Sequence, residues 1–104
     1  MNSERRKMLE QFAQEDPNDP FNIYALALDY ATDNRTQAEQ LFTQLLEKHP
    51  DYLPVYYAAA DFFTAGNETE RATKILENGI TIATQQNNQK TLRELKAALL
   101  NLDF

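Results

Sequence analysis

The stretch AEQLFTQLLEKHP at residues 38–50 returns in altered form as ATKILENGITIAT at residues 72–84, a spacing of 34 residues. The segments that precede these stretches also correspond, with a spacing of 33 residues, and the paired positions are Ile23 with Tyr56, Leu26 with Ala59, Ala27 with Ala60 and Tyr30 with Phe63. A repeat of this length is typical of proteins built from similar units, each of which is too small to bury its apolar face alone. The sequence therefore predicts repeated units that stack on one another.

Apolar residues recur at helical spacing in six segments, which predicts six amphipathic helices. They are expected at residues 3–15, from a cap at Asp19 to Tyr30, from a cap at Asp33 or Asn34 to His49, at about residues 53–65, from a cap at Asn67 to about Ala83, and at residues 89–102. Prolines stand near several of these ends, where a missing backbone N–H is tolerated.

Two features of the second repeat invite a local prediction. Gly66 is expected to end the fourth helix in the left-handed conformation, and Asn67 with Glu70 has the spacing of a capping box for the fifth. Gly79 falls in the middle of the fifth helix, at a cost of about 1 kcal/mol relative to alanine. We expect a close approach of a neighbouring helix to be the reason that glycine occupies this position.

Composition and charge narrow the class of protein. The chain has 104 residues, of which 42% are hydrophobic and 25% charged, ordinary values for one folded domain. Its net charge of −6 repels the phosphates of nucleic acid, so no nucleic-acid partner is expected. No stretch is apolar enough to form a signal peptide or to cross a bilayer, so we expect a cytoplasmic protein without membrane contact.

The residue types that most catalytic and metal sites require are scarce. The chain has no cysteine, His49 is its only histidine and Ser3 its only serine, so neither a metal-ligand cluster nor an activated nucleophile is predicted. With only two glycines, a glycine-rich phosphate loop is not predicted either. We therefore expect no catalytic residue, no metal and no cofactor, and a chain that is not an enzyme.

The spacing of aromatic, small and apolar positions in each repeat, with a proline closing the first, resembles the tetratricopeptide repeat (TPR) family. The phrases at residues 16–21 and 91–95 are also similar to small bacterial members of this family whose function is unassigned. The resemblance implies an all-α fold, a right-handed antiparallel helix-pair stack of about six helices (a TPR-like α-solenoid). It implies a single domain over residues 1–104, with residues 3–15 as a half-repeat helix, 20–52 and 53–86 as the two repeats, and 89–102 as a capping helix.

The resemblance also implies a function, since TPR proteins bind partners in a concave groove lined by the first helix of each pair. This predicts a non-enzymatic protein–protein interaction module, a scaffold that binds a peptide or protein segment. Carried over by position, the groove positions are Phe21, Tyr24, Ala25, Leu28, Tyr57, Ala58, Asp61 and Thr64. Of these we expect Phe21, Tyr24, Leu28, Tyr57 and Asp61 to contact the partner. The two tyrosines could instead be core residues, because exposed anchors and core residues have the same sequence pattern.

The chemistry of these positions favours an apolar or basic partner segment, because the groove residues are neutral or acidic. The chaperone-binding subclass of the family clamps a terminal carboxylate with lysine and asparagine, and neither residue stands at these positions. The alternative interpretation is a small enzyme of unknown type that uses groove carboxylates such as Asp61.

The last helix raises the question of self-association. Leu95, Leu99 and Leu102 share one face, whereas Leu100 lies about 100° away from Leu99 around the helix. Leu100 and Phe104 could therefore cover the same helix of a second copy, forming a homodimer. We expect the monomer instead, because a net charge of −6 opposes association of identical chains.

Overall fold

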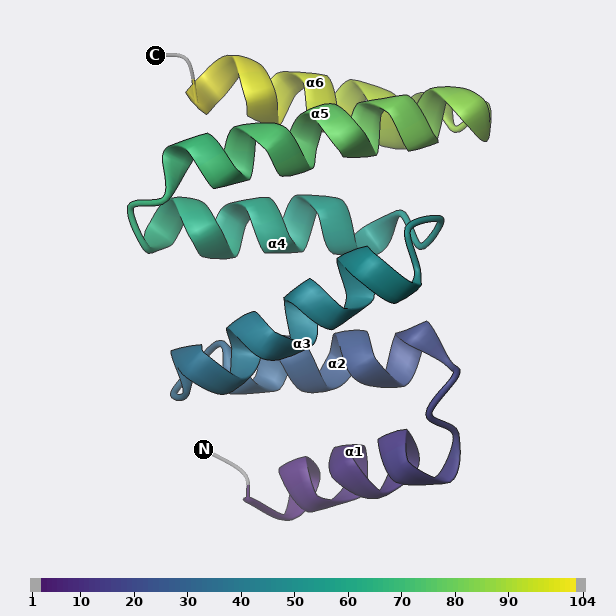
Figure 1. Ribbon diagram of the computed structural model, residues 1–104, viewed down its shortest axis with the longest axis vertical. Coiled ribbons are helices and arrows are strands. Elements are labelled where there is room, and N and C mark those ends of the chain that lie inside the picture. The colour runs from purple at the N-terminus through teal and green to yellow at the C-terminus, as the bar shows by residue number, and fades with distance from the viewer. Residues whose placement is uncertain (1–2, 103–104) are drawn as a thin grey trace. The chain divides into compact units, whose positions relative to one another are not determined.

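The computed structural model describes residues 3–102 of the chain. Within this range every regular element is an α-helix, and the order along the chain is α1 (Ser3–Glu15), α2 (Pro20–Tyr30), α3 (Arg35–Lys48), α4 (Pro54–Ala65), α5 (Thr69–Gln85) and α6 (Gln89–Leu102) (Figure 1). The predicted all-α class and its six helices are confirmed, and the helix ends agree to about two residues.

The chain divides into two compact units, Met1–His49 and Pro50–Phe104. The first contains α1, α2 and α3, and the second contains α4, α5 and α6. The division lies close to the predicted boundary between the repeats, at residues 52 and 53. That the two units form a single domain remains a prediction of the repeat pattern.

In the first unit, α2 packs against both α1 and α3. The buried side chains of α2 and α3 all belong to the apolar stripes of these helices, and they are Ile23, Leu26, Ala27, Ala38, Phe42 and Leu45. The helical period of the sequence therefore identifies correctly which face of each helix is turned inward.

Side chains close the N-terminal ends of α2 and α3, as predicted. The Asp19 carboxylate accepts a hydrogen bond from the backbone N–H of Phe21 at 3.0 Å, and the Asn34 side chain accepts one from Gln37 at 3.2 Å. Each bond satisfies a backbone donor that has no partner inside its helix. Of the two candidates for the cap of α3, Asn34 fills the role, while the Asp33 carboxylate binds a side chain of α1.

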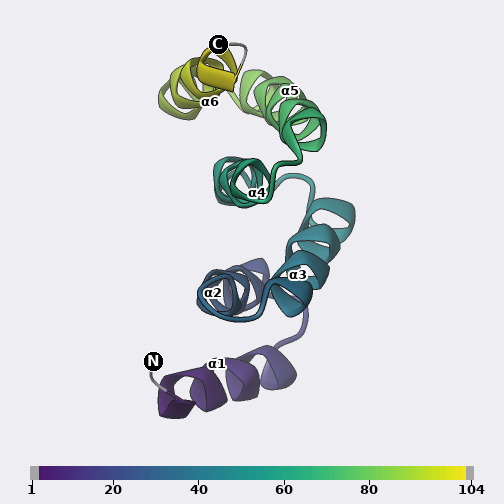
Figure 2. The same ribbon diagram turned by 90° about the vertical axis from the view of Figure 1, so that its left-hand side faces the viewer.

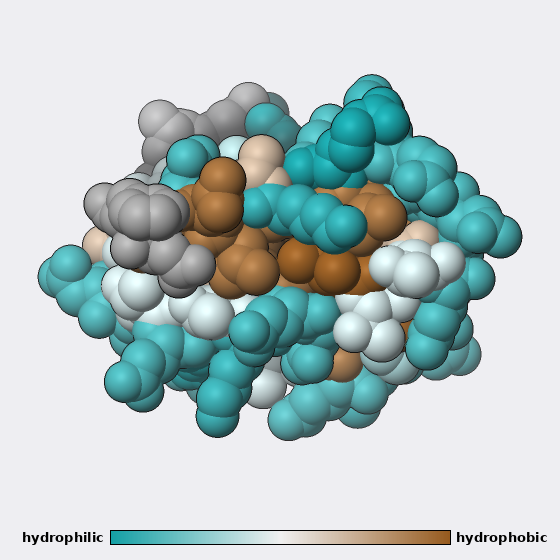
Figure 3. Space-filling model, turned by 90° about the horizontal axis from the view of Figure 1, so that it is seen from above, coloured by the Kyte–Doolittle hydropathy of each residue, from teal (hydrophilic) through white to brown (hydrophobic). Residues whose placement is uncertain are grey.

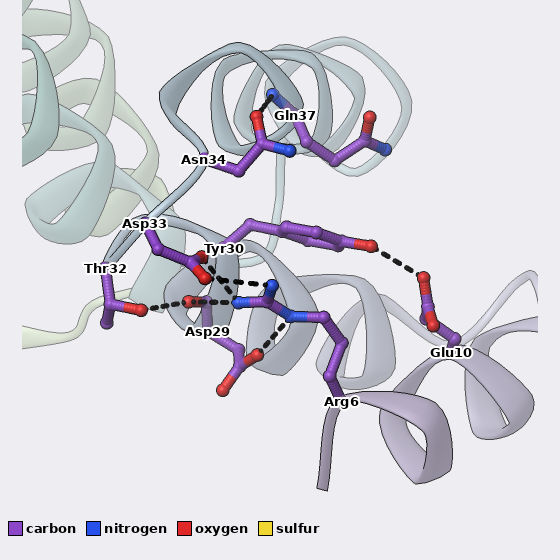
Figure 4. Close-up of polar contacts among 8 residues, drawn as sticks. All are labelled: Arg6, Glu10, Asp29, Tyr30, Thr32, Asp33, Asn34 and Gln37. Carbon is purple, nitrogen blue, oxygen red and sulfur yellow. Dashed lines mark hydrogen bonds and ion pairs between the residues drawn. The ribbon is translucent and has the colours of Figure 1, made fainter. Parts of the chain in front are cut away.

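α1 contains no fully buried residue, and polar contacts link it to α2 (Figure 4). The Arg6 guanidinium donates to the carboxylates of Asp29 and Asp33, each at 2.7 Å, and to the Asp29 carbonyl at 3.0 Å. It also lies 4.1 Å from the centre of the Tyr30 ring, and the Tyr30 hydroxyl donates to Glu10 at 2.6 Å. These bonds link two helices through charged groups that remain partly exposed to water.

In the second unit, α5 packs against both α4 and α6, which lie on the same side of it (Figure 2). Gly79 of α5 is buried at the point where the two neighbours converge. A Cβ atom added to Gly79 would lie 2.7 Å from the Tyr56 Cβ of α4 and 3.0 Å from the Leu95 Cδ1 of α6. The expected close approach at Gly79 is therefore confirmed.

The turn between α4 and α5 differs from the prediction. Gly66 has an ordinary negative φ of −89°, and the left-handed residue is Asn67, with φ 65°. Glu68 precedes the first turn of α5 without a side-chain cap bond, so the predicted capping box of Asn67 and Glu70 is wrong. The reason is that the Asn67 backbone must reverse the chain one residue after Gly66, and asparagine tolerates that conformation better than other non-glycine residues.

The same device ends α5. Asn87 takes the left-handed conformation with φ 55°, and the Asn88 N–H donates to the Ala83 carbonyl at 3.0 Å. The Asn88 side chain then accepts from the backbone N–H of Thr91 at 3.0 Å. One asparagine thus closes α5, and the next begins α6.

We predict that Gly79→Ala destabilises the protein. The added methyl group forces Tyr56 or Leu95 to move, and overpacking of this kind typically costs about 1–3 kcal/mol. The gain of about 1 kcal/mol in helix propensity offsets only part of this cost. Urea denaturation measures the change, with Asn78→Ala as the control, because Asn78 is the exposed neighbour on α5. A Gly79→Ala variant as stable as the wild type would contradict the prediction.

We predict that Arg6→Gln loosens α1 from α2. Hydrogen exchange of the α1 amides should become faster, and added salt should speed the exchange of the wild type because it screens the ion pairs. Lys7→Gln removes the same charge from an exposed neighbour and should have little effect. Equal exchange in the two variants would show that the Arg6 bonds do not hold α1.

We predict that the attachment of α1 to α2 depends on pH through Asp33. Hydrogen bonds from Arg6 hold the pKa of the Asp33 carboxyl below its ordinary value. A lowered pKa in the folded state means that the pairing stabilises the fold above the ordinary carboxyl pKa and is lost as pH falls through the lowered value. The protection of the α1 amides, measured as the intrinsic exchange rate at each pH divided by the observed rate, should therefore fall in acid, below the ordinary carboxyl pKa, and Arg6→Gln should weaken this fall.

Candidate functional site

The three predicted groove residues of α2 share one strip of this helix. Phe21, Tyr24 and Leu28 are three and four residues apart, the spacing that places side chains one above the other. The Phe21 side chain is 59% exposed and Leu28 is 41% exposed. Tyr24 is half-buried, and this burial raises the pKa of its phenol. The strip lies beside the buried stripe of α2 and is separate from it.

The two predicted residues of α4 also lie together on a strip, and the structure separates Tyr57 from its neighbour Tyr56. Tyr57 is 54% exposed, and Asp61, one turn along the same strip, is exposed as well. Tyr56 is buried, and its hydroxyl donates a hydrogen bond to the Pro50 carbonyl at 2.6 Å. Its burial, and to a smaller extent the negative charge of Asp51, raises the pKa of its phenol. Tyr57 is therefore a surface residue, and Tyr56 is the core tyrosine of this helix.

Tyr57 and Asp61 open onto a pocket of about 170 Å³, which we call the α4–α6 pocket. Its lining comes from three helices of the second unit and consists of Tyr57, Ala60, Asp61 and Thr64 of α4, Leu76 of α5, and Ala98, Asn101 and Leu102 of α6. Sequence reasoning did not identify the three α6 residues as part of a site. No sequence signal marks them, because their place in the pocket depends on how α6 is rotated against α4.

The α4–α6 pocket combines an apolar floor with polar groups that accept hydrogen bonds. Ala60 and Leu76 are buried, whereas the Asp61 carboxylate and the Asn101 amide are on exposed residues. The Thr64 hydroxyl donates to the Ala60 carbonyl at 2.8 Å, so the Thr64 oxygen can only accept in the pocket. This arrangement can hold a side chain that has an apolar stem and a hydrogen-bond donor at its end.

A larger hollow of about 610 Å³ surrounds the start of α5. It is lined by the turn and first helical residues Asn67, Glu68, Thr69, Glu70, Arg71 and Lys74, and none of the predicted site residues is among them. Across residues 3–102, no three His, Asp or Glu side chains are grouped as a metal ion would require. In the same range, no helix is both long and apolar enough to pass through a membrane.

Known proteins share both the sequence pattern and the fold. Residues 29–99 match the tetratricopeptide repeat family model. A tetratricopeptide repeat domain protein from Salinibacter ruber, solved by NMR in solution, is 38% identical over 84% of this chain and 89% of its own, with a TM-score of 0.79. A crystal structure of such a domain from the same organism is 36% identical over 82% of this chain and 96% of its own, with a TM-score of 0.75.

A solution structure from Bordetella parapertussis has the same fold at 18% identity, with a TM-score of 0.78 over 94% of this chain and 86% of its own. No curated protein matches the chain. The predicted resemblance to bacterial repeat proteins is confirmed by these relatives. The two repeat periods, the six helices and the match over residues 29–99 together show that this chain belongs to the tetratricopeptide repeat family.

Proposed function

We propose that this chain is a non-enzymatic protein-interaction module that binds a peptide or protein segment along the first helices of its repeats, α2 and α4. The TPR fold in general suggests protein–protein interaction, and proteins of this family are typically scaffolds without enzymatic activity. The specific proposal is that the two strips, Phe21–Tyr24–Leu28 and Tyr57–Asp61, contact the partner.

The observation that carries this proposal is the exposure of large apolar side chains on both strips. Phe21, Leu28 and Tyr57 leave about half of their surface open to water, although buried stripes lie beside them on the same helices. Grouped exposed apolar residues often mark interaction sites, and tyrosine is frequent at such sites because its ring is rigid and its hydroxyl polar.

The alternative of an enzyme that uses groove carboxylates has no comparable support. Among the described residues that line the α4–α6 pocket, Asp61 is the only titratable carboxylate, and neither histidine nor serine joins it. General acid–base or nucleophilic catalysis needs a second group within hydrogen-bond reach. We therefore propose that the chain binds an apolar or basic segment of a protein partner, and that its ligand is not a substrate, a nucleic acid or a membrane. We also propose that the protein is cytoplasmic.

We predict that short peptides selected from a random library will bind the wild-type chain and lose affinity for Leu28→Ala and Tyr57→Ala. Truncation of a well-packed contact should cost more than 1 kcal/mol, or about fivefold in Kd. Isothermal titration calorimetry measures the change, with Met8→Ala as the control, because Met8 is 55% exposed on α1, outside both strips. Peptides that bind Leu28→Ala, Tyr57→Ala and the Met8→Ala control with equal affinity would show that the strips are not the binding surface.

Self-association is the remaining question, and we propose that the chain is a monomer. In the view onto α5 and α6, apolar side chains gather in a band that polar ones cross (Figure 3). Leu100 of α6, one of the two residues of the predicted homodimer alternative, is 62% exposed. Phe104, the other residue of that alternative, lies outside the described residues.

We predict that light scattering will give the mass of one chain at micromolar concentration, because the net charge of −6 opposes association. A chain that ends at Asn101 is the matched comparison. A dimeric wild type whose truncation is monomeric would contradict the prediction and identify the C-terminus as the interface.

A further inference from the structure

We propose that the α4–α6 pocket binds a cationic side chain, lysine or arginine, of the partner segment. The inference rests on the proposed function and names the chemistry that the second repeat recognises. It concerns the second unit alone, since all eight lining residues belong to α4, α5 and α6.

The charge of the pocket favours a cation. The Asp61 carboxylate has no hydrogen bond or ion pair with another described residue, and no lysine or arginine is among the residues that line the pocket. By contrast, Arg6 occupies the carboxylates of Asp29 and Asp33 in the first unit. An uncompensated carboxylate at the edge of a pocket attracts a positively charged side chain.

The polar groups of the pocket are suited to a donor. The hydroxyl proton of Thr64 is already bonded to the Ala60 carbonyl, which leaves the Thr64 oxygen as an acceptor beside Asp61. The Asn101 amide provides a further carbonyl oxygen across the pocket on α6. Lysine and arginine carry only donors at their ends, so these acceptors fit them.

The apolar parts of the pocket fit the rest of such a side chain. Leu76 and Ala60 are 1% and 3% exposed, and they form a floor on which methylene groups can pack. The exposed Tyr57 ring lies one helical turn from Asp61 on the same face of α4. A cation held by Asp61 therefore comes within reach of the ring face, an interaction worth about 0.5–1 kcal/mol at exposed sites.

Other side chains fit less well. A carboxylate would meet the like charge of Asp61. A leucine would bury part of Asp61 without giving it a bond, and an unsatisfied charged group loses its hydration without compensation.

The test uses peptides selected for binding to the wild-type chain, with each lysine or arginine replaced in turn by norleucine, which keeps the apolar stem and removes the charge. The protein variants are Asp61→Asn and, as the control with the same loss of charge, Glu77→Gln on the exposed surface of α5. Circular dichroism checks that each variant is folded, and calorimetry gives Kd for every combination.

We expect one position of the peptide at which norleucine weakens binding roughly three- to tenfold, the range of a partly exposed ion pair with a cation–π contact. Asp61→Asn should weaken binding of the charged peptide by a similar factor and leave binding of that norleucine peptide unchanged. Glu77→Gln should change neither, and Asp61→Asn should reduce the salt dependence of Kd.

Two results would overturn the inference, and they can be told apart. Peptides that lose affinity for Leu28→Ala and Tyr57→Ala but are insensitive to Asp61→Asn would refute the cation pocket and Asp61 as a contact, and would leave the proposed interaction module intact. Peptides with a leucine or a glutamate at the sensitive position would also refute the cation pocket alone. If no peptide from the library binds the chain, the proposed function fails, and the cation pocket fails with it.

Discussion

Close approach of helices at small residues is the constraint on which the second unit depends. Gly79 lies where α4 and α6 both meet α5, and a methyl group there would overlap Tyr56 and press on Leu95. Glycine lowers the intrinsic stability of α5 by about 1 kcal/mol relative to alanine. It is therefore favoured only where the closer packing of the neighbouring helices stabilises the fold by more than this amount. Because α4 and α6 both pack against the same side of α5, they come close enough for both to line the α4–α6 pocket.

The first unit uses different physics at its outer helix. α1 contains no fully buried residue, and Met8 and Phe12 are 55% and 43% exposed, so its apolar surface is only partly removed from water. The Arg6 bonds to α2 act instead through charges that remain partly hydrated. Such contacts respond to salt and to protonation, whereas the packing around Gly79 does not. The two ends of the described chain should therefore differ in how solution conditions affect them.

Helical geometry places the predicted groove residues beside a known stripe, and whether they bind a partner stays a prediction. The stripe of α4 assigns Tyr56 to the core, whereas the sequence left Tyr57 open as a core or a surface residue, and the structure exposes it. Position alone could not reveal that Tyr24 is half-buried while Phe21 and Leu28 are open. Nor could it show that Asn101 of α6 stands near Asp61 of α4, since that depends on the packing of both helices against α5.

By itself the sequence determined the helices, their inward faces and the cap at Asp19, because these depend on residues within a few positions of one another. It narrowed the cap of α3 to Asp33 or Asn34, and the structure selects Asn34, while Asp33 pairs with Arg6. The tertiary structure decided that Asn67 rather than Gly66 takes the left-handed conformation, that Arg6 binds residues 23 and 27 positions away, and that three helices enclose one pocket. Those features depend on the rotation and offset of packed helices. Helical periodicity is a local property of the chain, so it does not predict the rotation or the offset of one helix against another.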